Sequence, residues 1–175
     1  MAEFQLGSIS TGTLRPEDLI PAFTYTLGAL AHNPISNLSQ FKSKAMADTW
    51  QNAINIINSS NRRPIAYDHP EIHELIDELQ DALQEYCPPF VYFGTHPGDG
   101  ADFGFWPDMN RLDEELYNQT GAPHLDKVPS YCLPMHQDYP YGEIELKDDN
   151  VIVQLSDHGN VTVMDMERNV IWSVV

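Results

Sequence analysis

Apolar residues recur at helical spacing through the first half of the chain. A first helix is predicted from Pro16, because proline suits the first helical position and Glu17-Asp18 suit the positive end of a helix. Pro21 is expected to kink its first turns or delay its start, and Asn33-Pro34 to end it. Its apolar positions are Leu19, Ile20, Phe23, Leu27 and Leu30.

Two more helices are predicted before residue 88. The second carries an apolar face from Leu38 to Ile57, and turn-prone residues 58–61 stop it. The third begins with a capping box, Asp68 with Glu71, which has Pro70 just inside. Its buried stripe consists of Ile72, Leu75, Ile76, Leu79, Leu83 and Tyr86.

The pattern changes to strand periodicity after Cys87-Pro88-Pro89. A short aromatic strand at 90–93 and a return strand at 103–106 flank a glycine-rich turn at 94–102. A short helix is predicted around 109–118, followed by an irregular connection over 119–142. Four β-rich runs separated by tight-turn residues complete the chain, at 143–147, 151–155, 161–166 and 170–175.

Helices followed by antiparallel strands are typical of an α+β fold. We expect three N-terminal helices to pack on one antiparallel sheet of five or six strands that ends in a C-terminal β-meander. The length of 175 residues suits a single domain. The chain shows no internal repeat and no low-complexity tract, but its charge is distributed unevenly.

The charge is concentrated in the middle of the sequence. The formal net charge is −17, from 26 acidic and 9 basic side chains. Residues 1–67 are near neutral, residues 68–150 hold 19 acidic and 3 basic side chains, and residues 151–175 are mildly acidic. This balance argues against direct nucleic-acid binding, which needs clustered Lys and Arg, and against an anionic membrane surface.

The location expected from the sequence is a reducing cytoplasm. The start carries no signal-peptide pattern, and no apolar run approaches the length that spans a bilayer. Cys87 and Cys132 are too few for a disulfide framework, although one bridge between them stays open. Both are expected to be half-buried small residues and not reactive thiolates.

The third predicted helix carries a row of carboxylates opposite its apolar stripe. No Lys or Arg occurs between residues 64 and 110 to neutralise them. Two interpretations stay open: the ordinary solvent face of a very acidic protein, and a face that binds a basic partner. Partner binding would explain why like charges that weaken the helix are kept at this spacing. The row consists of Glu71, Glu74, Glu78, Asp81 and Glu85.

The segment Gly94–Asp108 gathers acids, a histidine, glycines and aromatics. It matches neither a calcium loop nor a phosphate-cradling loop, so a structured hairpin, a partner-binding loop and a catalytic site remain open. As a binding loop, it would use His96, Asp99 and Asp102, with Phe103, Phe105 and Trp106 as apolar anchors. As a catalytic site, it would be a small metal-dependent hydrolase centred on His96, Asp99 and Asp102.

A second histidine group lies on the third predicted helix. His69, His73 and Asp77 follow one another at four-residue spacing, which lets two imidazoles share a helix face and hold zinc. The spacing fixes no further ligand, although the long connection offers His124, His136 and Asp138. No metal or other cofactor is therefore assigned from the sequence.

Three segments together carry a resemblance to known proteins. They are residues 6–19, residues 93–106 and residues 156–162. With these segments the chain resembles a family of small bacteriophage and mobile-element proteins of unknown function. The resemblance implies a bacterial host cytoplasm, where small acidic proteins of this kind often inhibit host enzymes or defence complexes.

The leading hypothesis is therefore a non-enzymatic, phage-type acidic protein. It would inhibit or modulate a host protein with a basic surface, such as a defence or nucleic-acid-binding complex, through residues 68–150. The alternatives are the metal-dependent hydrolase and a virion structural or assembly protein, which would self-associate.

Overall fold

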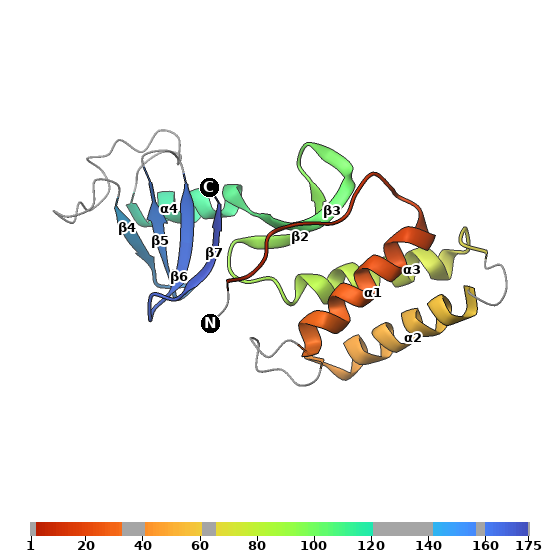
Figure 1. Ribbon diagram of the computed structural model, residues 1–175. Helices are drawn as coiled ribbons and strands as arrows, with labels where there is room; N and C mark the ends of the chain where they lie inside the picture. The colour runs from red at the N-terminus through yellow and green to blue at the C-terminus, as the bar shows by residue number, and fades with distance from the viewer. Residues whose placement is uncertain (1–2, 33–40, 61–65, 121–141, 157–159, 175) are drawn as a thin grey trace. The chain divides into compact units, whose positions relative to one another are not determined.

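A computed structural model describes residues 3–32, 41–60, 66–120, 142–156 and 160–174. Within these residues the fold is α+β, with the strands arranged in one sheet of three and one of four (Figure 1). Its contacts divide the chain into two compact units. We call Gly7–Cys87 with Tyr92–Trp106 the helical unit. The meander unit consists of Met1–Leu6, Pro88–Val91 and Pro107–Val175.

The helical unit is built on α1 (Pro16–His32), α2 (Lys44–Ser60) and α3 (Pro70–Gln84). The apolar stripe predicted for the first helix is buried, with Phe23 and Leu27 fully inaccessible to solvent. Pro21 lies inside α1 without ending it, and the helix begins at Pro16 as predicted. Thr24 is also fully buried, and its hydroxyl donates to the Ile20 carbonyl at 2.6 Å, which satisfies it inside the core.

Helix α2 begins later than its apolar pattern predicts. Ser43 caps it, because its hydroxyl accepts a hydrogen bond from the Met46 N–H at 3.1 Å. Phe41, which the pattern placed inside the helix, lies before it and packs against Trp50. A Cβ on Gly28 of α1 would lie 2.9 Å from Trp50 Nε1, so glycine permits the close approach of this indole to α1.

The three-stranded sheet has the order β1-β3-β2, from β1 (Gly7–Ser10), β2 (Val91–His96) and β3 (Asp99–Pro107). Strand β1 is a short edge strand that pairs antiparallel with β3. Gly104 faces Gly7 so closely that an added Cβ would lie 2.2 Å from the Gly7 carbonyl oxygen. Phe23 of α1 packs edge-on against Phe93 and Phe103, which places α1 against this sheet.

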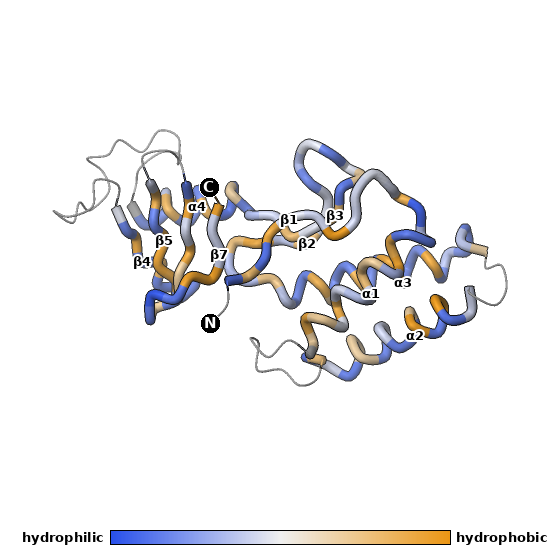
Figure 2. The backbone as a smooth tube through the Cα atoms, viewed as in Figure 1, coloured by the Kyte–Doolittle hydropathy of each residue, from blue (hydrophilic) through white to orange (hydrophobic). Residues whose placement is uncertain are grey.

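The meander unit contains α4 (Met109–Thr120) and four strands, β4 (Glu143–Leu146), β5 (Val151–Leu155), β6 (Val161–Asp165) and β7 (Val170–Val174). The strands pair antiparallel in chain order, which is the meander that the turn chemistry predicts. Alternate residues such as Val151 and Val153 are buried, and the orange and blue positions in Figure 2 mark the apolar and polar residues along these strands.

Trp172 of β7 is the largest fully buried side chain in the meander unit. Its indole N–H donates to the Pro89 carbonyl at 2.8 Å. Phe90, the next residue, has a φ of 59°, an uncommon conformation for a bulky side chain, and its ring is nevertheless buried. The Asp108 N–H donates to the Phe90 carbonyl at 2.8 Å, so this turn is held to both α4 and β7.

The arrangement of the strands differs from the prediction. The strands form two separate sheets of three and four, where one sheet of five or six was expected. The periodicity of a strand sets which residues face a core, but it does not choose the strand's neighbours. The prediction of a single domain stays a prediction beside the two compact units.

Candidate functional site

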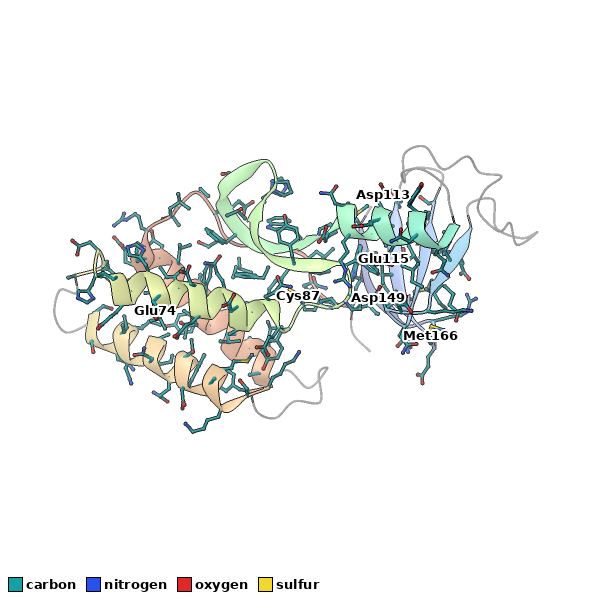
Figure 3. All side chains as sticks on the ribbon, turned by 180° about the vertical axis from the view of Figure 1, so that it is seen from behind. Glu74, Cys87, Asp113, Glu115, Asp149 and Met166 are labelled. Carbon is teal, nitrogen blue, oxygen red and sulfur yellow. The ribbon has the colours of Figure 1, made fainter. Side chains whose placement is uncertain are left out.

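The carboxylate row predicted on the third helix lies on the exposed side of α3. Glu71, Glu74, Glu78, Asp81 and Glu85 are all exposed, as is Asp77 beside them. The opposite side of α3 carries its six buried residues, from Ile72 to Leu83. Glu74 is labelled on this helix in Figure 3.

The row is not neutralised by the cations that the structure describes in the helical unit. Arg15 pairs with Glu17, and Lys44 pairs with Asp48. Lys42 donates to the Glu85 main-chain carbonyl and lies 4.8 Å from the centre of the Tyr86 ring, so it caps the end of α3. Within the described residues no Lys or Arg forms an ion pair with an α3 carboxylate.

The start of α3 differs from the capping box that the sequence indicates. The N-cap residue is His69, not Asp68, and its Nδ1 accepts a hydrogen bond from the Glu71 N–H at 3.4 Å. Pro70 at the first helical position fits its prediction. The Glu71 carboxylate lies 3.7 Å from the His69 Nδ1, and the Glu78 Oε2 accepts from the Thr49 hydroxyl of α2 at 3.1 Å.

The glycine-rich segment forms the β2–β3 hairpin, with Pro97-Gly98 as its turn. The strands are longer and the turn tighter than predicted. His96 is exposed, and its Nδ1 accepts from the Gly98 N–H at 3.0 Å. Its ring packs edge-on against Trp106, with 4.7 Å between the ring centres. The Trp106 indole N–H donates to the Gly94 carbonyl at 3.1 Å.

Two of the three proposed apolar anchors are core residues, which corrects the prediction. Phe103 and Phe105 keep only 8% and 4% of their surface exposed. Phe103 packs against Phe23, and Phe105 packs against Phe93, so neither ring is available to a partner while the unit is folded. Trp106 is half-buried and keeps part of its surface open.

Tyr92 is a hairpin residue that the sequence reading missed. It is half-buried, and its hydroxyl donates to the Thr95 carbonyl at 3.1 Å. Its ring also lies 3.4 Å from where a Cβ on Gly94 would stand. The strand alternation could have found it, because Tyr92 lies between the buried Val91 and Phe93 and must face the other side.

The two acids of the hairpin have separate local roles. Asp99 accepts from the Ala101 N–H at 2.9 Å, and Asp102 accepts from the Ser8 hydroxyl of β1 at 3.0 Å. The second Asp102 oxygen is buried and has no hydrogen-bond partner among the described residues. Among the described residues, no three His, Cys, Asp or Glu side chains converge into a metal-binding group, at the hairpin or at His69, His73 and Asp77. His124, His136 and Asp138 lie outside the described residues.

Cys87 is half-buried at the end of α3 and forms no disulfide with another described residue. Burial raises its pKa to about 12, and the nearby Lys42 only partly opposes this effect. A thiol with such a pKa is protonated at neutral pH, so it is a poor nucleophile, as the sequence predicts. Cys132 lies outside the described residues, and a bridge between the two stays untested.

A polar hollow of about 390 Å³ in the meander unit was not predicted from the sequence. It lies between α4 and the β4–β5 turn, and Figure 3 labels Glu115 and Asp149 there. The Arg111 guanidinium binds Asp149 at 2.9 Å, and the Gln119 side chain donates to the Glu145 carbonyl of the edge strand β4. Its remaining lining residues are Asn118, Leu146, Lys147 and Asp148.

Comparisons with protein-family models, with curated proteins and with solved structures found no match. Across the part of the chain that the structure describes, no helix has the length and apolar character needed to cross a bilayer. The functional argument therefore rests on the chain's own geometry.

Proposed function

We propose that this protein is a non-enzymatic binding protein that engages a basic surface of a partner protein through its helical unit. The observation that carries the proposal is the exposed carboxylate row of α3, which the described Lys and Arg residues leave without ion pairs. Its members repeat every three or four residues, so they lie along one side of the helix over about four turns.

The energetics of α3 support a role beyond solubility. Like charges at this spacing cost about 0.2–0.5 kcal/mol per pair. Asp81 and Glu85 also lie at the negative end of the helix dipole, where cations are favoured. A solvent face built for stability would place Lys or Arg there, so retaining acids is better explained by recognition of a cationic surface.

The row supplies steering, and the hairpin supplies contact area. Charge complementarity raises the association rate and is weakened by salt. Trp106, with His96 against it and Tyr92 on the same hairpin, provides partly exposed aromatic surface of the kind that dominates binding energy. Trp106 thus replaces Phe103 and Phe105 as the proposed apolar anchor.

The biological setting of the proposal comes from the three resembling sequence segments. In that setting the protein is of bacteriophage or mobile-element type, acts in the bacterial host cytoplasm, and inhibits or modulates a host protein. A partner that itself holds nucleic acid would present the basic surface required, which the carboxylate row would occupy in place of phosphates.

The test is affinity capture from bacterial lysate over a salt series, followed by binding measurements with the captured partner. The test variant is E74Q/E78Q/D81N/E85Q. The matched control is E114Q/E145Q/D148N/E167Q, which removes the same number of exposed carboxylates from the meander unit. We expect the α3 variant to lose the partner and to associate at least about tenfold more slowly, with the control close to wild type.

An equal loss of partner binding in both variants would show that only the net charge matters, and that the α3 row has no specific role. The same partners, captured by the α3 variant at the same salt tolerance, would overturn the proposal. Sedimentation of the free protein adds a separate check, because stable self-association would favour the alternative of an assembly protein.

A further inference from the structure

The β2–β3 hairpin contains a histidine whose neutral form is required by its hydrogen bond. His96 Nδ1 accepts from the Gly98 main-chain N–H at 3.0 Å. A main-chain N–H is always a donor, so this nitrogen must carry a lone pair and the ring proton must be on Nε2. A protonated imidazole has donors on both nitrogens and accepts no hydrogen bond.

The surroundings of His96 leave it open to solvent protons. The side chain is exposed, and no carboxylate of the described residues lies within 4.0 Å of its ring nitrogens. The ionisable groups of the hairpin itself are Asp99, which accepts from Ala101, and Asp102, which accepts from Ser8. Beta-strand β1 carries no ionisable side chain.

The charged groups of the helices in this unit are held by other contacts or lie on the α3 face. In α1, Glu17 pairs with Arg15, and Asp18 accepts from Thr13. The hydrogen bond between the hairpin and α3 is neutral, because the Phe93 N–H donates to the Gln84 amide oxygen at 2.9 Å.

We propose that His96 makes the tip of the β2–β3 hairpin a pH-responsive element. A proton taken from solvent onto Nδ1 breaks the bond from the Gly98 N–H and places two donors against each other. The ring centres of His96 and Trp106 are 4.7 Å apart, which is within cation–π range, so the negative face of the indole holds the imidazolium in contact. The turn at Pro97-Gly98 therefore gives way, and Asp99 loses its fixed position beside it.

This switch is a property of the free protein and stands without a partner. Any effect on binding rests on the proposed function, since His96 and Trp106 belong to the surface assigned to the partner. A turn that does not respond to pH would overturn the switch and leave the binding proposal in place. Failure of the binding test would overturn the proposed function and leave the switch in place.

The experiment is amide NMR of the wild-type protein from about pH 8 to about pH 5, the range in which histidine side chains titrate. We expect the Gly98 amide resonance to move with the His96 ring resonances. After correction for the intrinsic pH dependence of exchange, Gly98 should become about fivefold less protected, as expected for one lost hydrogen bond.

The matched variant is His96→Asn, whose side-chain oxygen accepts from the same N–H in an Asx turn but does not titrate. It should keep the Gly98 protection of the neutral protein at both ends of the pH range. His73→Gln, on α3, should leave the Gly98 titration unchanged. A Gly98 amide that titrates equally in His96→Asn, or that does not respond in wild type, would overturn the proposal.

Trp106 emission gives a second readout that does not depend on amide assignments. In Trp50→Phe/Trp172→Phe the emission comes from Trp106 alone, and imidazolium contact should quench it as the pH falls. The quenching should vanish when His96→Asn is added. If the double variant does not fold, the NMR measurement on wild type still decides the outcome.

Discussion

Two groups of carboxylates, one in each unit of this protein, are used in opposite ways. In the meander unit, the Glu143 carboxylate accepts hydrogen bonds from both terminal nitrogens of Arg168 at 2.8 and 2.9 Å, and the Glu143 side chain is 23% exposed. Asp149 is 15% exposed beside Arg111, whose guanidinium also lies over the Phe90 ring. In the helical unit, Glu71 of α3 is 85% exposed, and no Lys or Arg reaches it within the described structure.

The contrast separates carboxylates that stabilise the fold through ion pairs from carboxylates that remain accessible to a partner. Paired, partly buried carboxylates tie the β4 edge and the β4–β5 turn to the rest of their unit. Among the described α3 carboxylates, Glu78 accepts from Thr49 of α2, and like-charge repulsion along the row weakens the helix. If charge were placed only for stability, Lys or Arg would alternate with the acids of the row.

The largest effect is expected from Trp172→Ala, which tests whether the units unfold together. Removing this buried indole should cost about 3–5 kcal/mol, since it leaves a cavity and an unpaired Pro89 carbonyl. The remaining indoles, Trp50 and Trp106, both lie in the helical unit. Urea unfolding followed by their fluorescence therefore reports the helical unit alone.

If the chain unfolds as a single cooperative domain, the free energy of unfolding from Trp50 and Trp106 fluorescence should fall by the full cost of Trp172→Ala. If the units unfold independently, the fluorescence transition of Trp172→Ala should have the same urea midpoint as that of Trp172→Phe. Trp172→Phe keeps an aromatic ring and serves as the control. The second outcome would contradict the prediction of one domain.

A smaller effect is expected from Gly104→Ala in β3. The new methyl group would stand 2.2 Å from the Gly7 carbonyl oxygen, which is main chain and cannot rotate away. We expect a loss of about 1–3 kcal/mol in the free energy of unfolding, measured in urea, with β1 displaced. Gly100→Ala in the same strand is the control, because nothing lies within 4 Å of its added methyl group, and it should be nearly neutral.

The smallest effects come from removing one charge in each unit, and they should have opposite signs. Glu143→Gln should destabilise by about 0.5–1 kcal/mol through the loss of its Arg168 pair. Asp81→Asn should stabilise by about 0.2–0.5 kcal/mol, because it removes like-charge repulsion near the negative end of α3. Urea unfolding at low and high salt measures the change in the free energy of unfolding for each variant. High salt should make both changes smaller, because it screens charge interactions.

A destabilising Asp81→Asn would show that the α3 row has a structural partner and would remove the contrast between the units. It would also weaken the proposed function, since a structural role would then account for the acids.

Much of the local structure could be predicted from sequence patterns. The end of α1 at His32, the four strands of the meander and the helix that became α4 follow from periodicity and turn residues. The caps were less accessible, because the apolar pattern runs across Ser43 and because Asp68, a usual N-cap residue, stands directly before His69. Exposure of the α3 acids was also foreseeable, because an apolar stripe on one side of a helix forces the other side outward.

The amino-acid sequence by itself determined the α+β class, the helical and strand segments, and the concentration of negative charge in residues 68–150. These are local properties, set by spacing along the chain. Only the tertiary structure decided that the strands form two sheets, that Phe103 and Phe105 belong to the core with Trp106 left half-exposed, and that the helical unit's described cations are engaged away from the α3 carboxylates. Those outcomes depend on contacts between distant residues, and periodicity sets the side a residue faces but not the neighbour it meets there.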